Sequence, residues 1–205
     1  MRKLKVFLDF NEEESYLNDM ARKGYLLKKY STFGIYHFIE GEPQELTYKI
    51  DYKVFRNHAD FEDYKALFED AGWIHVYGTK LGGNQYFIPK NKGADNEIFS
   101  SRESAASRYK TFYNLCSINV AVAAMCIIAV LSTNGFNLSA FGFLTPGLWD
   151  MAGADFWRAF FFELPFVIFR LLGPILLIGM GVVYGYWGSK AKRTYDLQMK
   201  GCENR

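Results

Sequence analysis

The chain has 205 residues, and its 24 lysines and arginines nearly balance its 22 aspartates and glutamates. A formal net charge of +2 argues against a nucleic-acid-binding protein that works through a broad basic field. Three cysteines are too few for a disulfide framework and three histidines leave little for a metal site, so we expect neither a metal nor a cofactor.

The charges divide the chain into two unlike halves. Residues 1–110 hold 17 Lys and Arg and 17 Asp and Glu, whereas residues 111–205 hold seven and five. This contrast predicts a polar domain at 1–90, a linker at 91–111 and an apolar membrane region after it.

Two long apolar stretches predict transmembrane helices. The first, 112–131, has 20 residues without a charge, and the second, 166–188, has Arg170 as its one charge before the basic tail. About 20 apolar residues suffice for a helix to cross the hydrocarbon core of a bilayer. The lipid bilayer is therefore an expected partner. The stretch at 132–165 contains glycines and interfacial aromatic residues, which predicts an external loop that lies partly on the membrane.

Basic residues flank these stretches unequally. Seven lysines and arginines lie on their outer sides, against Arg158 alone in the connection. This bias predicts a cell-membrane protein whose two termini, with a tail at 189–205, lie in the cytoplasm. Residues 97–110 favour a helix that continues into the first span. Its basic residues would then meet anionic headgroups: Arg102, Arg108 and Lys110.

Four residues around the second span are candidates for helix packing or for a functional role. Glu163 and Arg170 share a helix face if the helix continues through Pro165. The pair allows two interpretations, a charge relay or substrate contact, and an interfacial arginine that reaches outward and pairs with the glutamate. Gly181 and Gly185 form a small-residue motif for contact with a membrane-protein partner or a second copy.

The soluble half is duplicated at an offset of 48 residues. The matched pairs are Tyr16 and Tyr64, Gly24 and Gly72, Gly34 and Gly82, and Phe38 and Tyr86. The strand before each helix also recurs if the second copy carries a six-residue insertion. Each copy is predicted as strand, helix, strand, strand, at 3–10, 11–23, 25–31 and 35–40, and at 46–54, 58–71, 73–79 and 84–89. Asn11 is the expected N-cap of the first helix.

Two such units predict an α+β domain with mainly antiparallel strands and two helices on one face. The element order resembles that of gyrase-inhibitor-like and haem-binding SOUL proteins, which implies a ligand cleft between the two copies. Candidates for contact with a small hydrophobic ligand are aromatic residues on or beside the strands: Tyr36, Phe38, Tyr48, Trp73 and Tyr86. The alternative is that these side chains fill the core, with any surplus forming a surface for a partner.

No catalytic constellation is evident in the sequence. The histidines at 37, 58 and 75 share no metal-ligand spacing. Asp9 and Asp51 occupy matching places in the predicted repeat, where a paired-carboxylate site competes with separate capping or turn roles. Phosphate loops, dinucleotide fingerprints and hydrolase motifs are absent. These observations favour a protein that is not an enzyme.

Four short runs resemble a known family. They are ESYLNDMARKGY at 14–25, FIEGEP at 38–43, YKID at 48–51 and EDAGW at 69–73. Together with Tyr64 they resemble the bacterial family called domain of unknown function 2812. The resemblance implies a cytoplasmic N-terminal domain followed by membrane spans, and no established activity.

The sequence therefore favours a membrane-anchored sensor or regulatory protein whose cytoplasmic domain binds a small hydrophobic ligand or a protein partner. One alternative is an accessory subunit of a transporter or another membrane complex. A further alternative is an enzyme that acts on lipid, for which the candidate residues are Asp51, His58 and Glu69.

Overall fold

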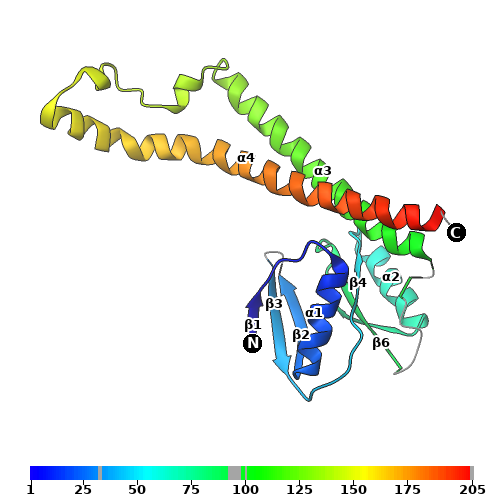
Figure 1. The fold of residues 1–205 in the computed structure, drawn as a ribbon. Coiled ribbons are helices and arrows are strands. Elements are labelled where there is room, and N and C mark those ends of the chain that lie inside the picture. Colours follow the sequence, from blue (N-terminus) through cyan, green and yellow to red (C-terminus); the bar gives the residue numbers. More distant parts are fainter. Residues whose placement is uncertain (32–33, 92–97, 100, 204–205) are drawn as a thin grey trace. The chain divides into compact units, whose positions relative to one another are not determined.

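The computed structural model describes residues 1–31, 34–91, 98–99 and 101–203 (Figure 1). The chain divides into two compact units. One comprises residues 1–114 together with 189–205, and the other comprises residues 115–188.

The first unit contains an α+β domain with two antiparallel three-stranded sheets, and it confirms the predicted class. Hydrogen bonds join the strands in the orders β1-β3-β2 and β4-β6-β5. The first strand is shorter than predicted, because the chain leaves the ladder after Leu4. In chain order the elements are β1 (Arg2–Leu4), α1 (Phe10–Arg22), β2 (Tyr25–Ser31), β3 (Ile35–Glu40), β4 (Lys49–Tyr52), α2 (His58–Asp70), β5 (Trp73–Tyr77) and β6 (Asn84–Pro89).

The duplication is visible in the geometry of the two copies. α1 and α2 have 13 residues each, and their first residues are 48 positions apart. Their N-caps, Asp9 and Asn57, are also 48 apart, and each side chain accepts a backbone N–H near the helix start. The ladder has an irregularity after Leu27 in β2 and after His75 in β5, again at the same offset. An irregularity of this kind bends a strand and increases its twist.

Three details of the predicted repeat are wrong. Asp9 caps α1 in place of Asn11, because the Asp9 side chain accepts the Asn11 N–H at 2.8 Å. β1 corresponds to β4 at the offset of 48, since Leu4 and Tyr52 hold equivalent positions against the last strand of each copy. The six-residue insertion is therefore unnecessary, and Asp51 in β4 is not the counterpart of Asp9.

After the hairpin turns the offset grows to 49, because the second turn is one residue longer. Gly34 and Gly83 take the left-handed backbone conformation of these turns, with φ of 77° and 75°. The structural matches are Gly34 with Gly83 and Phe38 with Phe87, in place of the predicted Gly82 and Tyr86.

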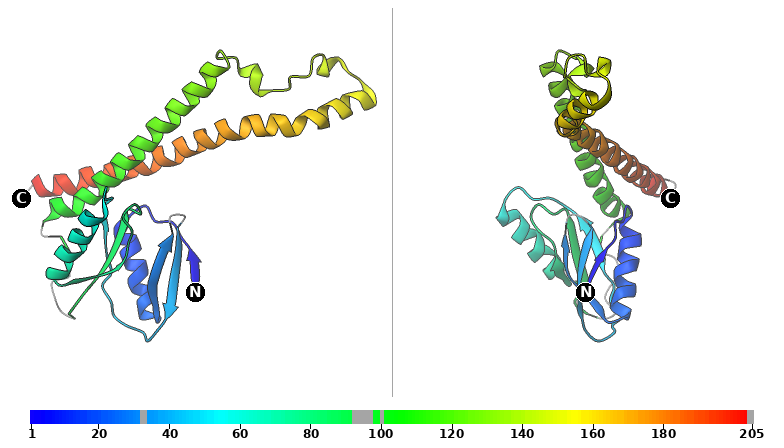
Figure 2. Two further views of the ribbon diagram at one scale, coloured as in Figure 1. Left: turned by 180° about the vertical axis from the view of Figure 1, so that it is seen from behind. Right: turned by 90° about the vertical axis from the view of Figure 1, so that its left-hand side faces the viewer.

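α1 and α2 pack on opposite faces of β6, which differs from the predicted shared face. The Tyr86 hydroxyl donates to Glu13 of α1, while the ring of the next residue, Phe87, stacks on Phe68 of α2. Successive strand residues point to opposite faces, so β6 has one helix on each side. The right-hand view of Figure 2 shows α1 and α2 on either side of the strands. α1 of the first copy thus contacts β6 of the second copy, and the two copies share one interior.

The core beneath α2 is aromatic. Its buried members are Phe55, Phe61, Tyr64, Trp73 and Phe87. Burying one large apolar side chain stabilises a fold by about 1.5–3 kcal/mol. Filling of the interior therefore accounts for much of the aromatic content of this domain.

Two long helices follow the domain, α3 (Arg102–Thr133) and α4 (Gly153–Glu203). Both contain a segment that is long and apolar enough to cross a membrane, at Glu103–Thr133 and Gly153–Lys200. Two short 3-10 helices lie between them, η1 (Leu138–Phe141) and η2 (Leu148–Asp150). α3 begins inside the predicted linker helix and continues without a break through the first predicted span. Residues 97 and 100 of that linker helix lie outside the described residues.

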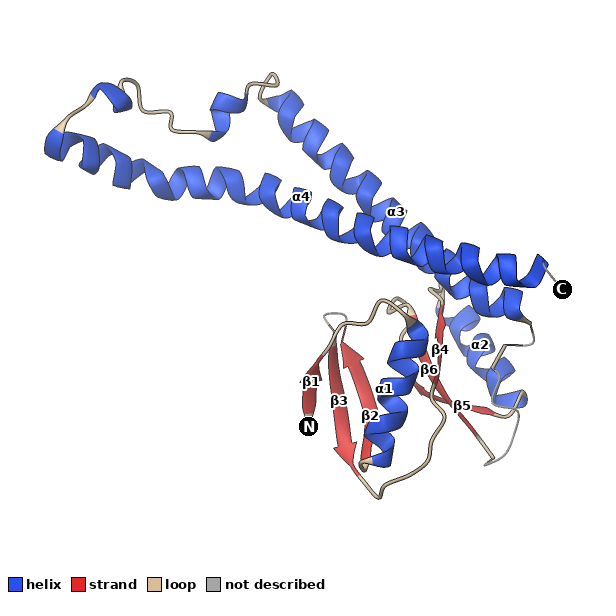
Figure 3. Ribbon diagram, in the orientation of Figure 1, coloured by secondary structure: helices blue, strands red, loops and turns tan. Residues whose placement is uncertain are grey.

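α4 is one continuous helix, drawn as an unbroken blue ribbon in Figure 3. It begins at Gly153, within the region predicted as a loop at 132–165, and it continues over the predicted tail to Glu203. Pro165 and Pro174 lie inside it. Each proline removes one N–H from the helical ladder, and apolar helices tolerate this loss when local adjustments satisfy the freed carbonyl.

Candidate functional site

A cleft of about 430 Å³ lies between the two copies of the repeat. β2 of the first copy contributes Lys29, Tyr30 and Ser31 to its wall. The second copy contributes residues of β5, the following turn and β6: Tyr77, Thr79, Gly82 and Asn84. This volume falls within the range of small-molecule sites in proteins. The cleft lies between the copies, where the resemblance to duplicated ligand-binding modules led us to expect one.

A buried hydrogen-bond network centred on Glu13 adjoins the cleft. The hydroxyls of Tyr36 and Tyr86 both donate to the same oxygen of the Glu13 carboxyl group, each at 2.6 Å. Asn84, which lines the cleft, donates to the Tyr86 hydroxyl at 3.1 Å and weakly to Glu13 at 3.5 Å. The Tyr30 ring lies 4.9 Å from that of Tyr36 and 5.7 Å from that of Tyr86. Tyr30 and Asn84, which both line the cleft, therefore contact this network directly.

Burial dominates the electrostatics of this network. Glu13 is 3% exposed, and its burial raises the pKa of the carboxyl group, against the opposing effect of the two tyrosine hydrogen bonds. The neighbouring charge of Glu14 raises that pKa further. Burial, together with the charge of Glu13, raises the pKa of Tyr30 to about 12. Burial and the charge of Glu13 also raise the pKa values of Tyr36 and Tyr86. These two tyrosines therefore remain neutral donors at physiological pH.

The turn on the second-copy side of the cleft is held by Gln85, which is fully buried. Its side-chain amide donates to the carbonyl oxygen of Thr79 at 2.9 Å and to that of Lys53 at 3.3 Å. Its side-chain oxygen lies 3.1 Å from Nε2 of His75. Gly78 leaves the space that this side chain occupies, because a Cβ at Gly78 would lie 1.8 Å from the Gln85 oxygen. Gln85 thus connects this turn to β6, the middle strand of its sheet.

Glu14, next to Glu13 on α1, belongs to a second buried network that reaches α3. Arg108 of α3 donates to Glu14 at 2.8 Å, to the Ile50 carbonyl oxygen at 2.6 Å and to the side chain of Asn11 at 2.9 Å. The backbone N–H of Ile50 also donates to Glu14, at 3.1 Å. We call this contact between α1, β4 and α3 the Arg108 latch.

Aromatic rings surround the Arg108 latch. The guanidinium lies 5.1 Å from the ring centroid of Phe10 and 5.3 Å from that of Tyr109, distances typical of cation–π contacts. The Tyr109 hydroxyl donates to Asp9, the N-cap of α1, at 3.0 Å. Arg108 is 4% exposed. The predicted contact of Arg108 with lipid headgroups is therefore wrong, because its charge is satisfied inside the domain.

The five predicted ligand residues are all buried in the domain core. Tyr36 and Tyr86 belong to the Glu13 network beside the cleft, and the Tyr48 hydroxyl donates to the backbone of Leu27 at 3.3 Å. Trp73 lines a separate surface hollow beside α2. Phe38 stacks on Tyr36. The core interpretation thus describes their positions better than direct lining of the cleft.

Sequence reasoning missed Glu13, Glu14, Lys29, Asn84 and Arg108. The sequence predicted that Arg108 meets the lipid headgroups, and it indicated no site role for the other four. One signal was available for the glutamates: they continue the helical spacing of the buried Leu17 and Met20. The sequence carried no comparable signal for Lys29 or Asn84.

The residues considered for lipid chemistry do not form one site. Asp51 accepts hydrogen bonds from the Tyr64 hydroxyl and from the backbone N–H of Tyr52, both at 2.7 Å. His58 is exposed beside Glu62, and Glu69 lines the hollow beside α2. Within the described part of the chain, no group of three or more His, Cys, Asp or Glu side chains could hold a metal ion.

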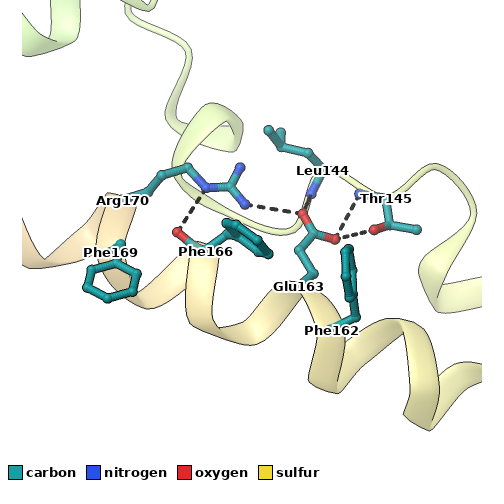
Figure 4. A pocket seen from close by; sticks show the side chains of 7 residues that line it. All are labelled: Leu144, Thr145, Phe162, Glu163, Phe166, Phe169 and Arg170. Carbon is teal, nitrogen blue, oxygen red and sulfur yellow. Dashed lines mark hydrogen bonds and ion pairs between the residues drawn. The ribbon is translucent and has the colours of Figure 1, made fainter.

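A second cavity, of about 680 Å³, lies in the unit formed by residues 115–188 (Figure 4). Glu163 accepts hydrogen bonds from the backbone N–H groups of Leu144 and Thr145 and from the Thr145 hydroxyl. Arg170 donates to Glu163 at 3.2 Å and to the carbonyl oxygen of Phe166 at 3.2 Å. The predicted pairing of Glu163 with Arg170 is present. The hydrogen bonds from Leu144 and Thr145 to Glu163 anchor the loop before η2 to α4.

Gly181 and Gly185 lie on α4, where a Cβ at either position would meet no other atom within 4 Å. The space beside Gly181 is open in the described structure. Their role in helix packing stays a prediction.

The fold thus defines a class, an α+β domain joined to two helices that are long and apolar enough to cross a membrane. The chain matches the family model described as "Protein of unknown function (DUF2812)" over residues 9–121, which is more than half of its length, and it belongs to this family. The match extends into α3 and includes Arg108. No curated protein and no solved structure matches the chain.

Proposed function

We propose that this protein is a membrane-anchored sensor or regulatory protein. Its N-terminal domain binds a small molecule in the cleft between the repeats, and α3 carries the response towards the membrane. The observation that carries this proposal is the adjacency of Glu13 and Glu14 on α1. One residue belongs to the network beside the cleft, and the other belongs to the Arg108 latch on α3.

Electrostatics supply a physical link between the two networks. The charge of Glu14 is one of the causes that raise the pKa of Glu13. Arg108 and Lys49 both pair with Glu14, at 2.8 Å and 3.3 Å. Loosening the Arg108 latch would therefore remove the buried one of these two cations and increase the effect of Glu14 on Glu13. A ligand that changes the hydrogen bonding of Asn84 would likewise act on Glu13. By linkage, such coupling works equally in both directions.

α3 is suited to carry this response. It starts at Arg102 and continues as one helix through the first apolar segment. Two cation–π contacts join the beginning of α3 to the end of α4. Lys110 lies over the Tyr195 ring at 5.9 Å, and Lys192 lies over the Tyr113 ring at 5.7 Å. Both apolar helices therefore have ends tied to the sensing unit, and we place both termini in the cytoplasm.

The test is native mass spectrometry of the full chain, purified gently from its own host in detergent. We expect a retained small molecule, and we expect Thr79→Trp to release it by filling the cleft. Leu81→Trp is the matched control, because Leu81 is 74% exposed in the same turn but does not line the cleft. Absence of any small molecule from the wild type, or its retention by Thr79→Trp, would contradict the proposal.

An accessory subunit of a membrane complex is the second candidate. The open space beside Gly181 favours it, since close helix contact requires small residues at such positions. Loss of a stoichiometric membrane partner on Gly181→Leu, with an empty cleft in the wild type, would support this candidate over the sensor.

A further inference from the structure

We propose that the cleft between the repeats binds a planar organic anion, an aromatic or conjugated carboxylate. This inference rests on the proposed function and specifies its ligand. The proposed ligand differs from the small hydrophobic ligand that the sequence favoured, because the walls of the cleft combine two aromatic rings with a cation and hydroxyl groups.

The charge of the cleft walls determines the sign of the charge that a ligand should carry. Of the described residues that line the cleft, Lys29 carries the one formal charge. Its side chain is exposed at the wall, so the ammonium group reaches a ligand without a large cost of burial. A carboxylate is the complementary group, and a charge-assisted hydrogen bond from lysine is stronger than one between neutral groups.

The aromatic rings and hydroxyl groups of the walls indicate the shape of the ligand. Tyr30 stands on the first-copy wall and Tyr77 on the second-copy wall, and each ring is half-buried. Aromatic side chains bind flat conjugated groups by stacking or edge contacts. Thr79 adds a hydroxyl group that donates to, or accepts from, polar substituents, and Ser31 adds a second, which lies 3.5 Å from His37 Nε2. A flat ring system with one carboxylate uses all of these groups.

The nearby Glu13 does not oppose an anion strongly. Its side chain is almost fully buried, and Tyr30, Tyr36, Tyr86 and Asn84 surround it. Burial raises the pKa of its carboxyl group, which favours the neutral form. An organic cation is the competing possibility. It would have to approach past Lys29 to reach a carboxyl group that accepts two tyrosine hydroxyls.

The test uses two probes of equal shape, naphthalene-2-carboxylate and the uncharged naphthalene-2-carboxamide. Binding to the full chain in lipid nanodiscs is measured by isothermal titration calorimetry, with empty nanodiscs subtracted. We expect the carboxylate to bind about tenfold more tightly than the amide. We expect Lys29→Gln to weaken carboxylate binding about fivefold and to leave amide binding unchanged.

Lys28→Gln is the matched control, because Lys28 is exposed on the same strand but does not line the cleft. Equal loss of affinity on Lys28→Gln would show a general charge effect and would overturn the assignment to Lys29. Equal binding of both probes, sensitive to Thr79→Trp, would overturn the anion class while the cleft remained a binding site. Binding of neither probe would overturn the anion class as well. A native ligand released by Thr79→Trp would then show that the proposed function itself survives.

Discussion

Arg108 of α3 donates to the Glu14 carboxylate of α1 at 2.8 Å, and both side chains are almost fully buried. A buried ion pair fixes geometry more than it adds stability, but removal of one partner leaves a charge unpaired in a low-dielectric interior. The beginning of α3 is therefore a structural part of the N-terminal domain. The family match, which continues to residue 121, includes this helix start.

Replacement of Arg108 by alanine should destabilise the first unit towards the lower end of about 3–5 kcal/mol. The buried Glu14 carboxylate would lose its buried partner and keep the partly exposed Lys49 ammonium at 3.3 Å and the Ile50 N–H at 3.1 Å. Near-UV circular dichroism during chemical denaturation of the full chain in detergent measures this change. Lys110→Ala is the control on the same helix, since Lys110 is exposed, and it should cost less than about 1 kcal/mol. Equal effects of the two variants would show that the Arg108 latch is dispensable.

The contribution of Glu13 to stability should depend on pH in a defined direction. Burial raises the pKa of the Glu13 carboxyl group above its ordinary value of 4.5, so the folded state holds the proton more tightly than the unfolded chain. This stabilisation is complete below the ordinary value and is lost as the pH rises through the raised one. The free energy of unfolding of the wild type should therefore fall relative to that of Glu13→Gln as the pH increases.

The difference between wild type and Glu13→Gln isolates this residue from other titrating groups. Burial lowers the pKa of His75, for example, which affects both proteins in the same way. Glu12→Gln is the control, because Glu12 is exposed in the first turn of the same helix. A constant difference between wild type and Glu13→Gln across the pH range would show that Glu13 does not titrate as described.

Gly78→Ala should disturb the turn beside the cleft. The added Cβ would lie 1.8 Å from the Gln85 side-chain oxygen and 2.7 Å from Nε2 of His75. Overpacking of this kind costs about 1–3 kcal/mol, measured by chemical denaturation. Gly41→Ala is the comparison, because its Cβ would meet only the flexible end of Leu26, at 3.2 Å. If Gly78→Ala were as stable as wild type, Gln85 would not hold the turn as the structure indicates.

Glu163→Ala should release the loop that is anchored to α4. The backbone N–H groups of Leu144 and Thr145 would lose their acceptor, and hydrogen exchange at these amides should accelerate about tenfold or more. Asp155→Ala is the control, because Asp155 and Arg158 form an exposed pair on the same helix at 3.7 Å. Unchanged exchange in Glu163→Ala would mean that other contacts hold this loop.

The proposed topology predicts on which side of the membrane three positions of the chain lie. Reporter fusions at both termini should be active in the cytoplasm, and a reporter inserted at Gly135, between the two apolar helices, should be active outside. The excess of lysines and arginines that predicts this topology is smaller than it was in the sequence, because Arg108 is buried in the domain and does not face the membrane. A cytoplasmic signal from Gly135 would contradict the two-span arrangement.

Composition and periodicity were sufficient to predict the α+β class and the two apolar helices, and matched residues at an offset of 48 predicted the duplication. Long apolar runs and helix stripes are local signals that survive in any tertiary context. The matching of the first strands failed because similar strand residues, Leu4–Phe10 and Leu46–Tyr52, align at the wrong offset. The matches of Tyr16 with Tyr64 and of Gly24 with Gly72 gave the correct offset of 48.

The candidate site was harder to predict, because it depends on contacts between distant segments. Arg108 lies 94 residues after Glu14, and no local pattern distinguishes a buried arginine from one at the membrane surface. The period-two pattern of β6 shows that Tyr86 and Phe87 face opposite ways, but not which helix covers each face. The aromatic candidates proved to be buried, since a small domain needs large side chains in its core.

The central claim is that the cleft and the start of α3 are energetically coupled through Glu13 and Glu14. A double-mutant cycle between Asn84→Ala and Arg108→Lys, measured by chemical denaturation of the full chain, tests it most directly. We predict an interaction energy above about 0.5 kcal/mol, whereas Asn84→Ala combined with Lys110→Ala should be additive. Additivity of Asn84→Ala with Arg108→Lys, within about 0.3 kcal/mol, would contradict the coupling.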